Sequence, residues 1–349
     1  MLYTSNSNEI ISIIIMLILY ILVYLFIVSK LKVNRTTNIF ILIAIMLRIM
    51  FTIIDSYFLY LPNSGADSVT FELHAYQLLQ GILPLNAYTF DNYPKIIYFI
   101  YLVIGRKPII IRTINGILSI ITGLIIYKSI NLTTKNKKRA TIGMLVFLLF
   151  PHSLIFSSII LRESFIVFFS TLSIYYFIRY AKDNKLSNIL RSYIFIIVAS
   201  IFHAGIIFIS LPYIYFILHD KSKSFPNKMK KAAVYLAILL VITILIALPE
   251  IFLRKVSFLE SSEALFNKLN FANEYGINSN IGSAYLTSFR IDSFKDLILY
   301  APLKVIYFLF SPMPWDIRGI QDIIAVILDA IFYIACVPKV ILSLKILKG

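Results

Sequence analysis

An aspartate in a turn of small residues is the residue of this chain best suited to acid–base chemistry. Asp67 lies in Ser64-Gly65-Ala66-Asp67-Ser68, directly after the apolar run 39–61 and before a segment that is typical of a short helix. A carboxylate at a membrane surface could accept the proton of an attacking hydroxyl group. The structural alternative is a helix N-cap, where aspartate is also favoured. We take Asp67 as the candidate catalytic base.

The predicted helix after Asp67 determines which neighbours could share its cavity. If this helix is regular, Phe71 and His74 lie on the face of Asp67, four and seven residues further on. His74 is therefore a candidate cavity residue. Glu72 points elsewhere on the same helix, so we expect it to be solvated.

A charged pair joins two apolar runs with almost no loop, in Leu161-Arg162-Glu163-Ser164. Such a pair often forms only an ion pair at a helix end. Alternatively, Arg162 could bind a phosphate group, because the guanidinium fork fits phosphate oxygens. Other cations expected on the same side of the membrane are candidates for the same role: Lys95, Arg112 and Arg290.

Four further residues could line a cavity for an acceptor, and each has a structural alternative. Glu163 could belong only to the ion pair, and Asp91 only to a turn. His203 could carry a proton or be a hydrogen-bonded structural histidine. Trp315, in Ser311-Pro-Met-Pro-Trp315, is first of all an interfacial anchor. The chain has no sequence pattern for zinc, ATP or a serine nucleophile, so we predict no cofactor, and nothing demands a divalent metal.

These residues belong to a chain with the composition of a polytopic membrane protein. Of its 349 residues, 59% are hydrophobic and 14% are charged, and the mean hydropathy is +0.85. We expect an all-α transmembrane bundle of about 8–10 spans, some re-entrant, because a span needs about 20 apolar residues. It would form one domain, 1–349, whose outer loops 61–107 and 252–318 make a cavity. The predicted spans are 9–29, 38–60, 108–127, 140–160, 164–179, 192–218, 232–251 and 319–338, and the pieces 95–104 and 296–311 are too short.

The basic residues indicate the orientation of the chain. The net charge of +16 comes largely from lysines and arginines in short loops between apolar runs, which is a signal of topology and not of nucleic-acid binding. If these loops are cytoplasmic, the N-terminus and Asp67 lie outside. The bias towards Ile, Asn and Lys suggests a bacterial source. We therefore expect a multi-pass protein of a bacterial cytoplasmic membrane with its active site on the outer face.

Two features inside the apolar runs imply tertiary structure: one segment should turn back on itself, and two charged residues should have partners on other helices. Segment 192–218 has basic loops on both sides, yet as a helix it spans only about 40 Å, too little for two crossings. We predict a re-entrant hairpin that turns near His203-Ala204-Gly205, with one long tilted helix as the alternative. Arg48 and Asp55 lie two helical turns apart in one span, so each is expected to find its partner on another helix.

Several short motifs follow one another along the chain. They are Leu47-Arg48-Ile49, Gly65-Ala66-Asp67, His74-Ala75, Tyr93-Pro94, Arg112-Thr-Ile-Asn115-Gly116 and the segment from Phe150-Pro151-His152 to Arg162-Glu163. In this order they resemble the GT-C membrane glycosyltransferases, in the branch of protein O-mannosyltransferases and lipid A aminoarabinose transferases, over roughly residues 40–220. Span 9–29 is extra with respect to this family, and the chain has no second acid next to Asp67. Ile201-Phe202-His203-Ala204-Gly205 is also similar to polysaccharide polymerases, and the Trp315 turn to bacterial relatives linked to surface polysaccharide.

The resemblance implies a helical bundle with an outer cavity and Asp67, by motif position, as the catalytic base. Its partners would be a polyprenyl-phosphate-linked sugar, a glycan or lipid acceptor and the lipid bilayer, and its product a cell-surface glycan. Two other functions stay open. A repeat-unit polymerase would depend on arginines more than on Asp67, and a transporter or flippase for a lipid-linked sugar would do no chemistry.

Overall fold

The computed structural model describes residues 6–31, 35–62, 64–85, 92–219 and 289–317, with scattered residues from 261 to 271 and from 319 to 338. In these ranges the regular structure is helical and there is no strand, so the prediction of an all-α membrane protein is confirmed. Two compact units, Met1–Ile244 and Leu245–Gly349, are distinguished, and each is described by itself. The expected single domain stays a prediction.

Four helices of the first unit are long and apolar enough to cross a membrane. They are α1 (Asn6–Leu31), α2 (Arg35–Tyr57), α5 (Pro108–Thr134) and α8 (Glu163–Asp183). α5 is the centre of the bundle, because 72% of its apolar window is buried, against 22–33% in the other three. Along α1 and α2 many large apolar side chains are exposed, as lipid-facing surfaces require.

A fifth crossing is broken at a proline. α6 (Lys137–Leu149) and α7 (Pro151–Ser158) meet at an angle of 53°. Phe150 between them is extended, with φ −63° and ψ 129°, as expected for a residue before proline. The first five predicted spans therefore correspond to helices. Of the other predicted spans, 232–251 lies outside the described residues and 319–338 is described only in part.

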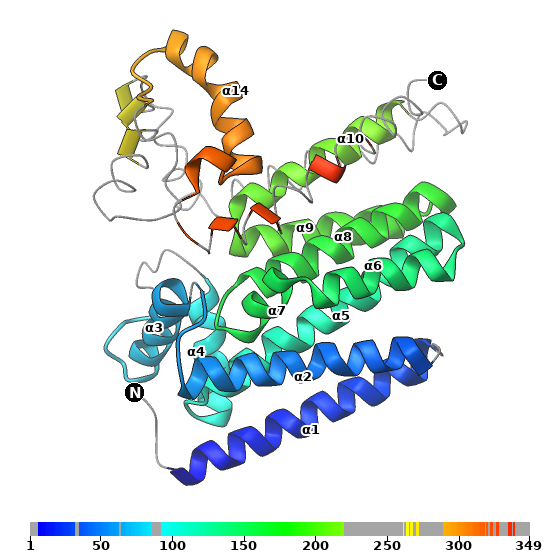
Figure 1. Ribbon diagram of the computed structural model, residues 1–349, viewed down its shortest axis with the longest axis vertical. Helices are drawn as coiled ribbons and strands as arrows, with labels where there is room; N and C mark the ends of the chain where they lie inside the picture. Colours follow the sequence, from blue (N-terminus) through cyan, green and yellow to red (C-terminus); the bar gives the residue numbers. More distant parts are fainter. Residues whose placement is uncertain are drawn as a thin grey trace. The chain divides into compact units, whose positions relative to one another are not determined.

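The sixth predicted span is a helical hairpin. α9 (Leu186–Phe202) ends at His203, a short 3-10 helix covers Ala204–Ile209, and α10 (Ser210–His219) runs back along α9 (Figure 1). Tyr193 of α9 packs near Tyr213 of α10 in one apolar cluster, with ring centroids 6.4 Å apart. The predicted turn near His203 is confirmed, although the first arm begins six residues earlier than predicted; re-entry from the membrane stays a prediction.

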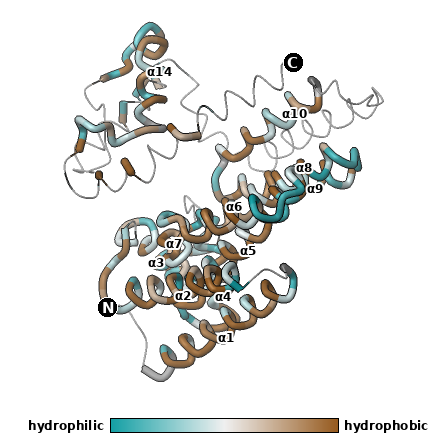
Figure 2. The backbone as a smooth tube through the Cα atoms, turned by 45° about the vertical axis from the view of Figure 1, so that its right-hand side comes forward, coloured by the Kyte–Doolittle hydropathy of each residue, from teal (hydrophilic) through white to brown (hydrophobic). Residues whose placement is uncertain are grey.

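The ends of the bundle differ in polarity. The C-terminal ends of α1, α5 and α8, which contain Lys30, Lys135 and Lys182, lie together at one end, and Figure 2 shows the connection between α8 and α9 there as strongly hydrophilic. Two short helices, α3 (Val69–Leu79) and α4 (Tyr93–Ile104), cover the opposite end. The predicted short piece 95–104 lies within α4. We call this second end, where α2 and α9 end and α5 and α8 begin, the Asp67 end.

The second unit contains one well-described helix, α14 (Phe294–Phe310). Its N-cap is Ser293, whose hydroxyl accepts the N–H of Asp296, and Pro302 lies inside it. A single 3-10 turn follows at Pro314–Asp316. The predicted short piece 296–311 corresponds to α14, which is 17 residues long.

Candidate active site

Asp67 lies in a single π-helical turn, Ser64–Ser68, which runs directly into α3. Asp67 is exposed, whereas Ser64 and Ser68 on either side of it are buried. Ser68, in the N-cap position of α3, has helical φ and ψ angles and makes no side-chain capping hydrogen bond. The chain thus passes from the π turn into the helix without the capping geometry that was the structural alternative for Asp67.

A hydrogen bond from another part of the chain joins this turn to the predicted charged pair. The Ser68 hydroxyl accepts the backbone N–H of Ile160 at 3.1 Å. Two residues further on, Arg162 and Glu163 begin α8, with Arg162 Nε 3.9 Å from Glu163 Oε1. Because Ser68 directly follows Asp67, the bond from Ile160 places the turn of Asp67 beside the turn of Arg162 and Glu163.

An asparagine that the sequence reasoning did not assign to the site holds this charged turn in place. Asn115 is fully buried in α5 and donates from Nδ2 to the carbonyl oxygens of Ile159 at 2.8 Å and Leu161 at 2.9 Å. Its Oδ1 accepts the Tyr93 hydroxyl at 3.2 Å. A buried asparagine in an apolar helix was the available signal, since polar side chains in spans are rarely without a role.

Aromatic rings lie beneath the charged groups. The Arg162 guanidinium carbon is 5.8 Å from the centroid of the Phe71 ring. Phe71 packs edge-on to Tyr93 at 5.5 Å, and Tyr93 to Phe165 at 5.6 Å. Phe71, Tyr93 and Phe165 thus form a continuous layer of rings next to the charged turn. His74 lies further along α3 and is half-buried, and its place in the cavity stays a prediction.

Asp55 and Arg112 form a buried ion pair between α2 and α5. Arg112 donates to Asp55 Oδ2 from Nη2 at 2.8 Å and from Nε at 3.1 Å, and the side chains are 3% and 0% exposed. The expectation that Asp55 has its partner on another helix is confirmed. The pair gives Arg112 a structural explanation, while its predicted contact with a donor phosphate stays a prediction.

Arg48 is held by hydrogen bonds at the break between α6 and α7. It donates to the Leu148 carbonyl at 3.0 Å and to the hydroxyls of Ser119, Ser153 and Ser157 at 2.9–3.1 Å. The proline break leaves the last carbonyls of α6 without intrahelical donors, and a cation is favourable at that negative end of a helix. The expectation of partners on other helices is confirmed, and these partners are hydroxyl and carbonyl oxygens.

The expectation that Glu72 is solvated is wrong. Glu72 is only 7% exposed. Its carboxylate accepts hydrogen bonds from Arg106 Nε at 2.9 Å and Nη2 at 2.8 Å, and from the Tyr101 hydroxyl at 3.1 Å. The Arg106 guanidinium also lies 3.8 Å from the centroid of the Tyr76 ring. α4 packs against this face of α3, and the turn at Gly105, with φ +73°, brings Arg106 back to it.

This cluster also changes the proton affinity of its members. The hydrogen bonds from Arg106 to Glu72 raise the pKa of the guanidinium above its ordinary value. Burial, and then the Glu72 charge, raise the pKa of the Tyr101 hydroxyl well above 10. Both groups therefore stay protonated near neutral pH, so the bonds that hold α3 on α4 persist.

The other predicted site residues of the described chain lie on α4, just after α9 and in the second unit. Lys95 is half-buried in the first turn of α4, next to Asn92, whose Nδ2 donates to the Ile201 carbonyl at 3.2 Å. His203 is exposed just after that point of α9. Asp91 lies outside the described residues. Arg290 and Trp315 belong to the second unit, where Arg290 Nε is 3.6 Å from Asp292 Oδ1 and Trp315 Nε1 donates to the Tyr307 hydroxyl at 2.8 Å.

Among the described residues, no group of three histidine, cysteine, aspartate or glutamate side chains could hold a metal ion. The exposed Asp67 carboxylate and the Arg162–Glu163 pair are charged groups at the Asp67 end that can accept a proton and bind an anionic leaving group.

The long apolar helices and the polar site at one end define a multi-pass membrane protein. The family model for dolichyl-phosphate-mannose-protein mannosyltransferases matches residues 93–247. No curated protein and no solved structure matches the chain. The family match confirms the resemblance to GT-C membrane glycosyltransferases. It includes Asn115, Arg162 and Glu163, whereas Asp67 precedes the matched residues.

Proposed function

We propose that this protein transfers a sugar from a polyprenyl-phosphate carrier to a glycan or lipid acceptor, at the outer face of a bacterial cytoplasmic membrane. Asp67 is the general base, and Arg162 binds the phosphate of the donor. The product is part of a cell-surface glycan. The observation that carries the proposal is the hydrogen bond from Ile160 N–H to Ser68 Oγ, which joins the turn of Asp67 to the turn of Arg162 and Glu163.

The two charged groups have separate tasks in the transfer. Asp67 removes the proton of the acceptor hydroxyl, whose oxygen attacks C1 of the donor sugar. The bond from C1 to the phosphate oxygen breaks, and polyprenyl phosphate leaves with the electron pair. Arg162 stabilises the negative charge that develops on this phosphate, which is the largest contribution expected in such reactions.

The position of the site suits a donor that is anchored in lipid. Asp67 and Arg162 lie where helices end or begin. In a membrane, the ends of spanning helices are at the depth at which a polyprenyl chain would expose its phosphate head. The lysine-containing loops that we assign to the cytoplasm lie at the opposite end of the bundle. The layer of Phe71, Tyr93 and Phe165 next to the charges would limit the access of water from that side, which favours transfer over hydrolysis.

The test is a single-turnover experiment on protein in nanodiscs, with extracted polyprenyl-phosphate sugars as donors and release of free polyprenyl phosphate as the readout. Asp67→Asn should lower the release rate by about 10²–10⁴-fold, the usual contribution of a general base. The matched control is Asp183→Asn, because Asp183 lies at the opposite end of the bundle, where it accepts from Asn188. This control should keep the wild-type rate.

Other outcomes would replace the proposal. Release of polyprenyl pyrophosphate from lipid-linked oligosaccharides, lost with Arg162→Ala and kept with Asp67→Asn, would indicate a repeat-unit polymerase. Delivery of lipid-linked sugar across the membrane, with no new glycosidic bond from any donor, would indicate a carrier.

A further inference from the structure

Two arginines at the end of the bundle opposite Asp67 share one aromatic ring. Arg179 lies near the end of α8 and Arg191 near the beginning of α9, on either side of the connection between these helices. Their guanidinium carbons lie 5.9 Å and 5.5 Å from the centroid of the Tyr176 ring. Arg179 is half-buried and Arg191 is exposed. The fold therefore places two positive charges close together at helix ends, the depth at which lipid head groups lie.

Neither of these guanidinium groups has a carboxylate partner among the described residues. The acid in the connection, Asp183, instead accepts the backbone N–H of Lys185 at 3.0 Å and Asn188 Nδ2 at 2.8 Å. Like charges repel one another, and the repulsion is stronger beside lipid of low dielectric constant than in water. An anion bound between Arg179 and Arg191 would remove this repulsion.

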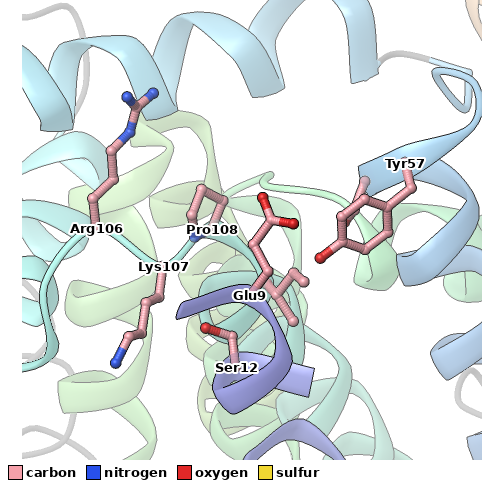
Figure 3. A pocket seen from close by; sticks show the side chains of 8 residues that line it. Glu9, Ser12, Tyr57, Arg106, Lys107 and Pro108 are labelled. Carbon is pink, nitrogen blue, oxygen red and sulfur yellow. The ribbon is translucent and has the colours of Figure 1, made fainter. Parts of the chain in front are cut away.

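The arginines at the Asp67 end are compensated by acidic residues of the chain itself. Arg106, Arg112 and Arg162 each have a carboxylate oxygen within 3.9 Å. Figure 3 shows the side chains of Arg106 and Lys107 extending in opposite directions, so these neighbouring cations do not converge on one place. The arginine pair at Tyr176 differs in both respects, since its charges converge and have no acid of the described chain beside them.

An exposed apolar stripe on α9 begins at the level of this arginine pair. Leu190, Ile194 and Ile201 are exposed, and their spacing of four and seven residues places them on one helix face. The stripe starts next to Arg191 and runs from the connection towards the Asp67 end. A cationic pair with an apolar stripe beside it matches a ligand with an anionic head and acyl chains, and basic pockets between transmembrane helices bind such head groups.

The two arginines also have a simpler explanation, because cations in short cytoplasmic loops set the topology of a membrane protein. That signal requires only positive charge, which lysine supplies as well as arginine does. It does not require two guanidinium groups over one tyrosine ring without a carboxylate. A phosphate ligand explains the residue type as well, since the guanidinium fork fits phosphate oxygens.

We propose that Arg179 and Arg191, beside the Tyr176 ring, bind the phosphate of an anionic glycerophospholipid whose acyl chains follow the stripe on α9. The ligand differs from the proposed sugar carrier, because sugar transfer requires the carrier phosphate at the Asp67 end. Bound lipid would hold the connected ends of α8 and α9 at the membrane surface. The binding itself does not depend on the transferase function.

The experiment is native mass spectrometry of the full chain in detergent, titrated with dioleoyl phosphatidylglycerol or, for comparison, dioleoyl phosphatidylcholine. The wild type should bind the anionic lipid more tightly. Arg179→Gln and Arg191→Gln should each weaken this binding about fivefold, which corresponds to about 1 kcal/mol, the contribution of one cation at an anionic membrane surface. Arg139→Gln is the matched control, because it removes the same charge from an exposed position at the same end of the bundle, and it should leave the binding unchanged.

The other outcomes of this titration would overturn the lipid site. Unchanged binding in Arg179→Gln and Arg191→Gln, or an equal loss in Arg139→Gln, would show that no specific pair is involved; if one arginine variant fails to fold, the other decides. Equal binding of the two lipids would exclude a site for an anion. Displacement of the lipid by glycerol phosphate alone would indicate a free-phosphate site, and tighter arginine-dependent binding of polyprenyl phosphate would indicate a carrier site. Because no sugar donor is present, none of these results bears on the proposed transferase.

Discussion

Replacing Asp55 by asparagine should destabilise the protein strongly while leaving its shape almost unchanged. Asp55 Oδ1 accepts the N–H of Leu61 at 3.0 Å, and an asparagine oxygen can take over that bond. Oδ2 accepts both bonds from Arg112, at 2.8 and 3.1 Å. Asp55→Asn therefore removes one charge from the pair and leaves the 3% exposed Arg112 side chain without its carboxylate.

The expected size of the effect follows from this burial. Removing one partner of a buried ion pair costs about 3–5 kcal/mol, because the remaining charge is not compensated. Arg112→Gln should cost a similar amount, since it isolates Asp55 in the same way. The double variant contains no charge at this place, so its cost should be at least about 2 kcal/mol below the sum of the two single costs.

The assay is reversible unfolding of purified protein in mixed micelles by titration with SDS, followed by circular dichroism, for the wild type, both single variants and the double variant. Arg139→Gln is the control, because the Arg139 side chain is exposed in the first turn of α6, and surface changes are usually within about 0.5 kcal/mol. Single costs below about 1 kcal/mol, or costs that add within about 0.5 kcal/mol, would refute the buried pair. Intact stability with abolished turnover in Arg112→Gln would instead support the predicted contact with the donor phosphate.

Three further changes test other parts of the bundle in the same unfolding assay. Arg48→Gln should cost more than about 2 kcal/mol, because buried carbonyl and hydroxyl groups lose their donor; a cost near zero would contradict the assigned network. Tyr101→Phe should cost about 1.5–3 kcal/mol at pH 8 through the lost bond to Glu72. The difference in unfolding free energy between Tyr101→Phe and the wild type should narrow towards pH 11. The raised pKa of Tyr101 stabilises the folded protein fully below the unfolded pKa near 10, and this stabilisation is lost as the pH rises through the folded pKa. A free-energy difference that stays constant or grows with pH would contradict this. Gly123→Ala should cost about 1–3 kcal/mol, since its new Cβ would lie 2.8 Å from the Leu148 side chain, and an unchanged stability would show that α6 can move away.

The membrane class and the helices of the first unit could be predicted from the sequence, because each is a local property. A long apolar run forms a helix wherever lipid must cover it, and α1, α2, α5 and α8 followed from run length alone. The hairpin at His203 could be predicted from lysines and arginines on both sides of one run. The proline break between α6 and α7 was less visible, since residues 140–160 also have the composition of one span.

The partners of the charged residues could not be predicted, because they come from distant parts of the chain. Regular spacing placed Glu72 on the solvent side of its helix, but α4 covers that side and Arg106 compensates the charge. Asp55 and Arg112 are both visible in the sequence, yet only the packing of α2 on α5 pairs them.

In the candidate site, too, the residues could be predicted from the sequence, but their contacts could not. Asp67, Arg162 and Glu163 could be named from the sequence, since charged residues at the ends of apolar runs are conspicuous. Their proximity depends on the bond from Ile160 to Ser68 and on Asn115, which holds the turn from inside the bundle. The sequence by itself determined that the chain lies in a membrane and where it could do chemistry, because apolar length and charge are properties of each segment. The tertiary structure decided which charges meet, because a buried charge must take whatever partner the neighbouring helices bring within about 3 Å.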